Sequence, residues 1–243
     1  MVVLGHRGGR GEGWPAENTL EAFARAIGEG ADGVELDVRL TKDGVAVVFH
    51  DTTLARATGG ADVRAVDRVA YAALPPLGGG LRIPRLVDVL DAMRGHIVNV
   101  EIKADVAPMS MLGNVPDRVL LVRTAAAAVA EARHTEVVFS SFDPLAVLAL
   151  AVASPRVPRG MLVGMQTPRA ATALPLALRY AIVAAHLDES LITAARAERL
   201  LRSKLRVVAW TVNDPERAKE LVALGTSWLI TDAPARILAA LAR

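Results

Sequence analysis

The chain has 243 residues, of which 52% are hydrophobic and 22% are charged, so it can fill a substantial core and is not expected to be disordered. It has no cysteine, which excludes a disulfide framework, a thiolate metal site and a cysteine nucleophile. With 28 basic against 26 acidic residues and only 4% aromatic residues, it lacks the charge and the stacking surface expected for a nucleic-acid partner.

No segment of the chain resembles a membrane span or a secretion signal. The most apolar runs, residues 145–153 and 170–178, are far shorter than the roughly 20 residues with which a helix crosses a bilayer. The N-terminal residues lack the basic region, apolar stretch and small-residue cleavage site of a signal peptide. We therefore expect a cytoplasmic protein without a membrane span, and the sequence leaves its oligomeric state open.

Short apolar stretches alternate along the chain with longer stretches of helical periodicity. The predicted strands are residues 2–5, 33–40, 97–102, 136–140, 160–164, 182–186, 206–211 and 228–231. The predicted helices are residues 19–29, 86–94, 117–132, 144–153, 168–176, 193–203, 215–224 and 234–241. This alternation predicts parallel strands joined by crossover helices. Eight such units favour an α/β fold of the (β/α)₈ TIM-barrel type, with a doubly wound open sheet as the alternative.

The run of residues 45–49 is also strand-like, but it follows the second predicted strand too closely to be its parallel neighbour. Only residues 41–44, Thr-Lys-Asp-Gly, separate the two, whereas a parallel crossover needs about a dozen residues or more. The Asp-Gly pair instead predicts a β-hairpin that brings His50 back onto the barrel rim. Residues 51–82, rich in Gly and Pro, then form a small insertion within a single domain of residues 1–243.

The residues before the first predicted helix have the pattern of a helix N-terminus. Asn18 stands in the N-cap position, Glu21 follows three residues later and Gly30 lies just beyond the C-terminal end. On this interpretation Glu17 is an acid placed favourably near the start of the helix.

Acidic and basic side chains gather at the carboxyl ends of the predicted strands. Glu35 and Asp37 are two residues apart on one strand, and Glu101 and Lys103 are two residues apart at the end of another. Because side chains alternate along a strand, each pair points the same way, toward the mouth of the barrel. Barrel enzymes hold their active sites at this end of the strands.

Three carboxylates gathered in one place are costly unless a cation accompanies them. Lys103 and Arg7 could neutralise them in a network of ion pairs. Alternatively, one divalent metal ion could lie between the oxygens, and an all-oxygen ligand set of Glu35, Asp37 and Glu101 suits Mg²⁺ or Ca²⁺ rather than zinc.

Two histidines and two cations are expected at the same rim. His6 and His50 are suited to general acid–base roles near neutral pH. Arg7 and Lys103 offer a guanidinium and an ammonium that match the charge and geometry of a phosphate group, unless they only balance the acids.

Two further side chains allow simpler interpretations. Trp210, near the end of a predicted strand, either lines the barrel mouth against a substrate or belongs to the core. His186 is interpreted as structural, because a lone histidine on an apolar strand gives no sign of a role in catalysis.

Taken together, these residues resemble the glycerophosphodiester phosphodiesterase family over nearly the whole chain. The segments that carry the resemblance are His6-Arg7-Gly8-Gly9, Pro15-Ala16-Glu17-Asn18-Thr19, Glu35-Leu36-Asp37-Val38, Thr41-Lys42-Asp43-Gly44, Phe49-His50-Asp51, Glu101-Ile102-Lys103, Ser140-Ser141-Phe142-Asp143, Trp210-Thr211-Val212-Asn213 and Ile230-Thr231-Asp232. Each segment alone is modest, but six of them in order within the first 103 residues are highly specific.

The resemblance implies a TIM barrel that hydrolyses a small glycerophosphodiester to sn-glycerol 3-phosphate and an alcohol. It implies one divalent metal ion held by Glu35, Asp37 and Glu101, and acid–base catalysis by His6 and His50. By the same resemblance, Arg7 and Lys103 match phosphate-contacting positions and Glu17 matches the acid of the motif near the first histidine. We expect these three residues and Trp210 to contact the substrate. The Gly-rich stretch before the second motif and the aromatic-poor insertion depart from the family pattern, so the alcohol headgroup stays open.

Other functions and several details stay open at this point. The same site could cleave lysophospholipids in a phospholipase D-type reaction, or the chain could bind phosphate esters without turnover. The choice between Mg²⁺ and Ca²⁺ and the assignment of acid and base to the two histidines are also open. The attacking oxygen is either water or the neighbouring glycerol hydroxyl, which would give a cyclic phosphate first.

Overall fold

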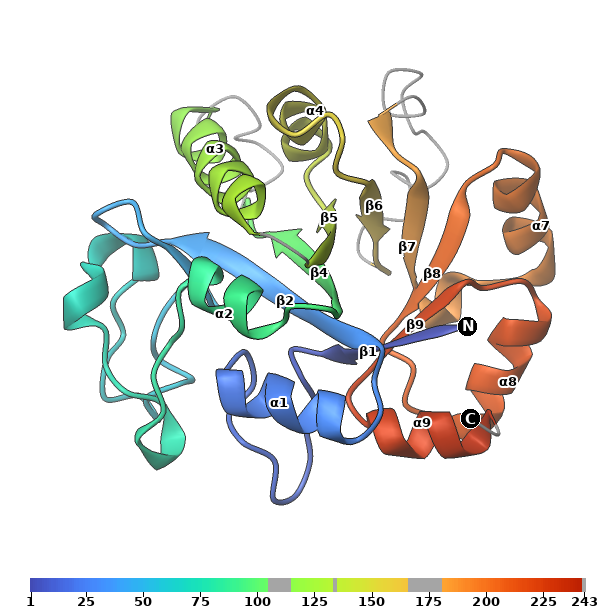
Figure 1. The fold of residues 1–243 in the computed structure, drawn as a ribbon, viewed down its shortest axis with the longest axis horizontal. Coiled ribbons are helices and arrows are strands. Elements are labelled where there is room, and N and C mark those ends of the chain that lie inside the picture. Colours follow the sequence, from blue (N-terminus) through green and yellow to red (C-terminus); the bar gives the residue numbers. More distant parts are fainter. Residues whose placement is uncertain (105–114, 133–134, 166–180, 242–243) are drawn as a thin grey trace.

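The computed structural model describes residues 1–104, 115–132, 135–165 and 181–241 of the chain. In these parts strands and helices alternate, as the apolar pattern predicts (Figure 1). The strands are β1 (Val2–His6), β2 (Gly33–Leu40), β3 (Ala46–Val48), β4 (Ile97–Ile102), β5 (Glu136–Ser141), β6 (Arg159–Val163), β7 (Ala184–Asp188), β8 (Arg206–Trp210) and β9 (Trp228–Thr231). The α-helices are α1 (Leu20–Gly28), α2 (Leu86–Ala92), α3 (Val115–Glu131), α4 (Pro144–Ala153), α7 (Ala194–Arg202), α8 (Pro215–Ala223) and α9 (Pro234–Ala240).

The parallel strands close into a barrel. Among the described residues, eight strands pair in parallel in the order β1, β9, β8, β7, β6, β5, β4 and β2, and β1 also pairs with β2, so neither edge is left open. The helices surround this barrel on the outside (Figure 1). The predicted (β/α)₈ TIM barrel is therefore confirmed, and the doubly wound open sheet is wrong.

β7 differs from the prediction in its boundaries. The sequence pattern predicts residues 182–186, whereas the strand runs from Ala184 to Asp188. Its pairing with β6 begins with Ala184 opposite Gly160 and continues to Leu187 opposite Val163. The apolar run thus starts before the strand, because pairing with the neighbouring strand, and not hydrophobicity alone, determines where it begins.

Two expectations concern the helices. The predicted helix at residues 168–176 lies outside the described residues. Within the described residues, none of the helices combines the length and the apolar character that crossing a membrane requires.

The predicted hairpin is present and brings the chain back to the barrel mouth. β3 pairs antiparallel with β2, with Val38 opposite Val48 and Leu40 opposite Ala46. Just beyond β3, the Phe49 N–H donates to the Asp37 carbonyl at 2.9 Å. The residue after Phe49 is His50, so the hairpin places this histidine beside the end of β2.

The insertion after the hairpin has a small apolar core of its own. Short 3₁₀ helices at Val66–Arg68, Tyr71–Ala73 and Gly78–Gly80 divide it. Its buried side chains form one cluster with those of the hairpin, consisting of Val47, Phe49, Leu54, Val66, Val69, Leu77 and Ile83. This packing supports the segment that carries His50.

The N-cap of α1 is Thr19, so the prediction of Asn18 as the cap is wrong. The Thr19 hydroxyl accepts the Ala22 N–H at 3.2 Å. Asn18 has a φ of 61°, and its side-chain amide donates instead to Asp37 Oδ2 at 2.9 Å. Its carboxamide is therefore part of the polar cluster at the barrel mouth, because it binds the Asp37 carboxylate instead of capping the N-terminus of α1.

His186 on β7 is fully buried, and neither of its ring nitrogens has a hydrogen-bond partner within the described structure. Its ring lies against Gly160 of β6, where an added Cβ would approach the His186 Cδ2 to 2.3 Å. Burial lowers the pKa of His186 from its ordinary value of 6.5 to about 4. The folded protein therefore holds this ring neutral.

We expect His186 to make the protein less stable as the pH falls. Because its pKa is lower in the folded than in the unfolded state, the unfolded chain takes up the proton first, and stability is lost between pH 6.5 and pH 4. At pH 5 the loss should amount to about 2 kcal/mol. Urea unfolding at pH 7 and pH 5 should show this loss in the wild type and not in His186→Leu. Equal pH dependence in the two proteins would contradict the assignment.

Candidate active site

One cavity of about 180 Å³ lies at the carboxyl ends of the barrel strands. Its lining combines ionisable side chains with an apolar wall and consists of His6, Arg7, Glu35, His50, Asn99, Glu101, Lys103, Phe142, Leu162, Trp210 and Ile230. The structure thus brings together most of the predicted site residues, which come from β1, β2, β4, the hairpin and β8. We call this cavity the central cavity.

Three buried carboxylates gather at this cavity, and two of them, Glu35 and Glu101, line it. Asp37 of β2 is in register with Glu101 of β4, and Glu35 precedes Asp37 by two residues on the same face. Each of the three can offer an oxygen that lies within 4.8 Å of the other two. Glu35 is 4% exposed, Asp37 is 0% exposed and Glu101 is 6% exposed, so water screens their mutual repulsion poorly.

Two cations pair with part of this cluster. Lys103 Nζ lies 3.0 Å from Asp37 Oδ1 and 2.6 Å from Glu101 Oε1. Arg7 Nε lies 3.1 Å from Asp37 Oδ2. Burial alone would raise the pKa of Asp37, but Lys103 and Arg7 outweigh it and hold that pKa below its usual range.

Glu35 has no such partner. Its Oε2 accepts the Arg7 backbone N–H at 3.1 Å and lies 3.9 Å from His6 Nε2. No lysine or arginine side chain of the described residues lies within ion-pair distance of it. Burial, together with the charges of Asp37 and Glu101, therefore raises the pKa of Glu35 well above its usual range.

The carboxylate cluster fits a divalent metal ion. Lys103 and Arg7 are two cations for three acids, and burial with the neighbouring like charges raises the pKa of Glu35 well above its usual range and that of Glu101 to about 7. A cation between the three carboxylates would allow all of them to ionise, because opposite charge lowers a carboxyl pKa. The donors are all oxygens, which suits Mg²⁺ or Ca²⁺. The ion pairs with Lys103 and Arg7 are therefore present, and the same three carboxylates could also hold a metal ion.

Each histidine of the cavity is held by a carboxylate. His6 Nδ1 lies 2.7 Å from Asp232 Oδ1, and His50 Nδ1 lies 2.7 Å from Asp51 Oδ1. A carboxylate at Nδ1 favours the tautomer with hydrogen on that nitrogen, which leaves Nε2 to exchange a proton. Burial lowers the pKa of both histidines, while the bonded carboxylates partly oppose this effect.

The two histidine–carboxylate pairs are joined through Glu17. Arg10 contacts both Asp232 and Glu17, and Arg56 contacts both Asp51 and Glu17. Arg7 Nη1 also donates to Glu17 Oε1, at 2.9 Å. Glu17, predicted as a substrate contact, does not line the central cavity, and its carboxylate is engaged by three arginines.

Three of these functional side chains were missed in the sequence. Asp51 directly follows His50, and Asp232 ends one of the segments that resemble the family. Nothing in the sequence, however, pairs Asp232 with His6, 226 residues away. Asn99 lines the cavity and donates to Ser140 Oγ at 3.1 Å. It precedes Glu101 by two residues on the same strand, so strand alternation could have identified it.

One wall of the cavity is apolar. Trp210 packs edge-to-face on Phe142 with ring centroids 5.5 Å apart, and its Nε1 donates to the His186 carbonyl at 3.1 Å. Lys103 Nζ lies 5.9 Å from the Phe142 ring centroid. Trp210 therefore lines the mouth of the barrel rather than the core, beside the charged groups.

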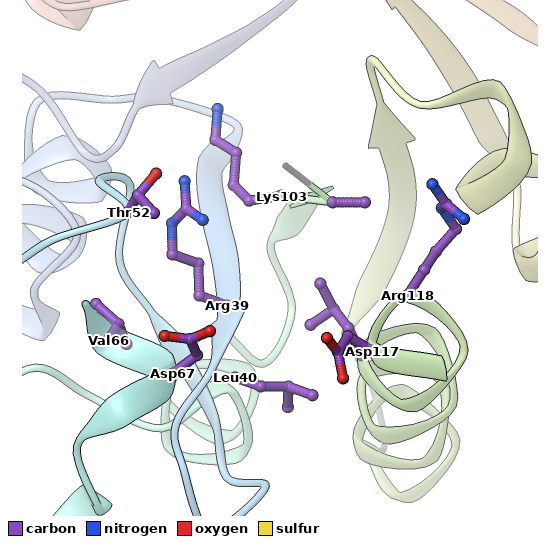
Figure 2. Close-up of a pocket in the computed structure, with 10 residues that line it drawn as sticks. Arg39, Leu40, Thr52, Val66, Asp67, Lys103, Asp117 and Arg118 are labelled. Atoms are coloured by element: carbon purple, nitrogen blue, oxygen red, sulfur yellow. The ribbon is translucent and has the colours of Figure 1, made fainter. Parts of the chain in front are cut away.

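A second cavity, of about 230 Å³, lies on the far side of Lys103. Figure 2 shows Arg39 and Lys103 at one side of it, Asp67 of the insertion below them, and Asp117 and Arg118 of α3 across from them. Arg118 is 4% exposed and forms an ion pair through Nε with the buried Asp143, at the start of α4.

Removing Arg118 should be strongly destabilising, because it leaves the Asp143 carboxylate buried without a cation. We expect Arg118→Met to lower the free energy of unfolding by about 3–5 kcal/mol. The matched control is Arg202→Met, which removes an exposed ion pair with Glu198 and should cost less than about 1 kcal/mol. Chemical denaturation measures both, and equal losses in the two variants would contradict a structural role for the buried pair.

Comparison with known proteins identifies the family. Residues 6–236 match the model of the glycerophosphoryl diester phosphodiesterase family. The chain belongs to this family. It is 29% identical over 251 residues to the glycerophosphodiester phosphodiesterase of Caldanaerobacter subterraneus, an alignment that covers 98% of this chain and 96% of the relative. The resemblance inferred from the sequence is thereby confirmed, and the protein is a glycerophosphodiester phosphodiesterase.

Solved structures of this family share the fold over the whole chain. The Thermotoga maritima glycerophosphodiester phosphodiesterase is 30% identical, with a TM-score of 0.71, and the match covers 100% of this chain and 98% of the other. An Oleispira antarctica phosphodiesterase in complex with its product sn-glycerol 3-phosphate is 25% identical, with a TM-score of 0.84 and coverage of 100% and 97%.

Proposed function

We propose that this phosphodiesterase hydrolyses small glycerophosphodiesters to sn-glycerol 3-phosphate and an alcohol, with one divalent metal ion and two histidines. The observation that carries the proposal is a cluster of three buried carboxylates beside one cavity, which two carboxylate-held imidazoles line. The complex of the Oleispira antarctica phosphodiesterase with sn-glycerol 3-phosphate supports the assignment of the product.

Glu35, Asp37 and Glu101 would hold the metal ion, either Mg²⁺ or Ca²⁺. When bound, the ion supplies positive charge against the phosphoryl oxygens, where negative charge develops during phosphoryl transfer. Because metal ligands must be deprotonated, binding should lower the pKa of Glu35, which burial and the neighbouring carboxylates raise in the metal-free protein.

Arg7 and Lys103 would orient the substrate phosphate. The Arg7 guanidinium and the Lys103 ammonium both line the central cavity, and their carboxylate partners hold them in place. Such preorganised cations stabilise charge that grows in the transition state without needing to reorganise. The apolar wall of Phe142 and Trp210 lies next to them and would contact the glycerol carbons.

His6 and His50 would move the two protons of the reaction. In each ring Nδ1 lies 2.7 Å from a carboxylate oxygen, which favours the tautomer with hydrogen on Nδ1 and leaves Nε2 to accept or donate a proton. We assign the base to His6, which is the more deeply buried and lies beside Glu35. We assign the acid to His50, because it borders a further cavity with space for the departing alcohol. Each transfer should contribute roughly 10²–10⁴-fold to the rate.

Phosphorus NMR of a glycerophosphodiester incubated with the protein and Mg²⁺ or Ca²⁺ tests this function. We expect the diester signal to be replaced by that of sn-glycerol 3-phosphate. A transient cyclic phosphate would identify the glycerol hydroxyl as the first attacking group, and its absence would favour water. Binding without turnover under either metal, or cleavage to glycerol and a phosphorylated alcohol, would contradict the proposal.

A further inference from the structure

A third cavity, of about 340 Å³, lies on the other side of His50. Its charged lining is formed by Arg10, Glu17 and Arg56, and its apolar lining includes Trp14 and Leu77. We call it the His50 cavity.

His50 is the one imidazole that connects this space to the central cavity. It lines both cavities, whereas His6 lines only the central one. The cavity of Figure 2 is bordered by Lys103 and by neither of the two imidazoles. A general acid must lie within hydrogen-bonding distance of the leaving oxygen. If His50 protonates the alcohol, the His50 cavity is the space beside this acid that can receive the body of that alcohol.

The carboxylate of Glu17 in this cavity already forms ion pairs with arginines of the protein. Glu17 Oε1 accepts from Arg7 Nη1 at 2.9 Å and from Arg56 Nη2 at 2.6 Å, and its Oε2 lies 3.5 Å from Arg10 Nη1. An ammonium headgroup would have to displace one of these guanidinium groups to reach the carboxylate.

The aromatic ring of Trp14 in this cavity also has a cationic partner from the protein. Arg25 places its guanidinium 4.3 Å from the centroid of the Trp14 ring. A cation–π contact of this kind is the main means by which proteins bind a quaternary ammonium group without a carboxylate. With Glu17 and Trp14 both engaged, an amino-alcohol headgroup would enter this space without a counter-charge.

Two guanidinium groups in the lining of the cavity are partly exposed. The side chains of Arg10 and Arg56 are 42% and 57% exposed. Arg56 uses Nε and Nη2 for Asp51 and Glu17, and its Nη1 has no hydrogen-bond partner within the described residues. Guanidinium N–H groups have no acceptor capacity, so the groups they can bind are oxygens such as alcohol hydroxyls.

We infer that the His50 cavity receives the leaving alcohol and prefers a neutral polyol headgroup, such as glycerol or inositol, to a cationic amino alcohol such as choline. This inference rests on the proposed function and specifies which alcohol headgroup the enzyme prefers. Donors from Arg10 and Arg56 would bind the hydroxyls, and the carbon skeleton would lie along the apolar part of the lining. An ammonium group gains neither contact.

The first test compares kcat/KM for glycerophosphoglycerol and glycerophosphoinositol with kcat/KM for glycerophosphocholine, at saturating Mg²⁺ or Ca²⁺. We expect both polyol esters to be favoured by about tenfold or more. If glycerophosphocholine is cleaved equally well or better, the inference about the headgroup fails while the proposed function stands. If none of the three is cleaved, the proposed function itself fails.

The second test places a free carboxylate at the rim of the cavity. Gly78 lines the cavity, is exposed, and an added Cβ there would meet nothing within 4 Å. Gly78→Asp should raise kcat/KM for glycerophosphocholine relative to glycerophosphoglycerol by about two- to fivefold, as expected for an exposed ion pair.

Gly78→Asn is the matched control, because it has the same shape without the charge and should keep the wild-type ratio. The effect of Gly78→Asp should also shrink as salt is added. If Asp and Asn at position 78 give the same substrate ratio, the headgroup does not occupy this cavity and the inference is overturned.

Discussion

Replacing Glu35 by Gln is expected to lower kcat by about a thousandfold, the equivalent of several kcal/mol of transition-state stabilisation by a metal ion. The reason is that the amide keeps the shape of the side chain but removes one of three charged ligands. Steady-state release of sn-glycerol 3-phosphate measures this loss. Glu21→Gln, on the exposed face of α1, is the control and should retain full activity.

The same variant should not damage the metal-free protein. Burial and the two neighbouring carboxylates raise the pKa of Glu35 and so favour its neutral form in the absence of metal, for which a glutamine is a close substitute. The wild type should gain about 2.7 kcal/mol of stability at a metal concentration one hundred times the dissociation constant, and the variant should gain much less. Full turnover by Glu35→Gln, or an unchanged stabilisation by metal, would contradict the ligand assignment.

Replacing each histidine in turn should separate the acid from the base. We expect His50→Gln to lower kcat by about 10²–10⁴-fold on an ester of glycerol 3-phosphate with an alkyl alcohol, because the alkoxide then leaves without a proton. On the p-nitrophenyl ester the loss should be much smaller, since p-nitrophenolate leaves without being protonated. His6→Gln should impair both reactions, because the attacking oxygen loses its base in each.

The control for this experiment is His96→Gln, at a residue that lines none of the three cavities discussed above. It should leave the rates on both esters unchanged. If His6→Gln is the variant restored by the p-nitrophenyl ester, the two roles are reversed. If neither variant depends on the leaving group, proton donation to the alcohol does not limit the reaction.

The sequence predicts the barrel and its hairpin because both depend on local patterns. The alternation of strands and helices follows from the apolar period, and the four residues 41–44 are too few for any connection but a hairpin. Strand alternation also placed Glu35 and Asp37 together, since the spacing of two residues fixes which face they share. These inferences needed no knowledge of which strands become neighbours.

The partners of the histidines depend on barrel closure and could not be predicted in the same way. Asp232 follows β9, and it reaches His6 because β9 pairs with β1. Asn18 illustrates a competition that local rules do not include. Its position suits an N-cap, but the Asp37 carboxylate brought there by β2 is the partner that it binds.

We propose that Glu35, Asp37 and Glu101 hold a metal ion on which hydrolysis depends. The most direct test follows the release of sn-glycerol 3-phosphate by the wild-type protein, first with an excess of chelator and then as Mg²⁺ or Ca²⁺ is added back. We predict no measurable release with chelator and a saturable return of activity with a single binding constant. The same rate of release with and without chelator would contradict the account.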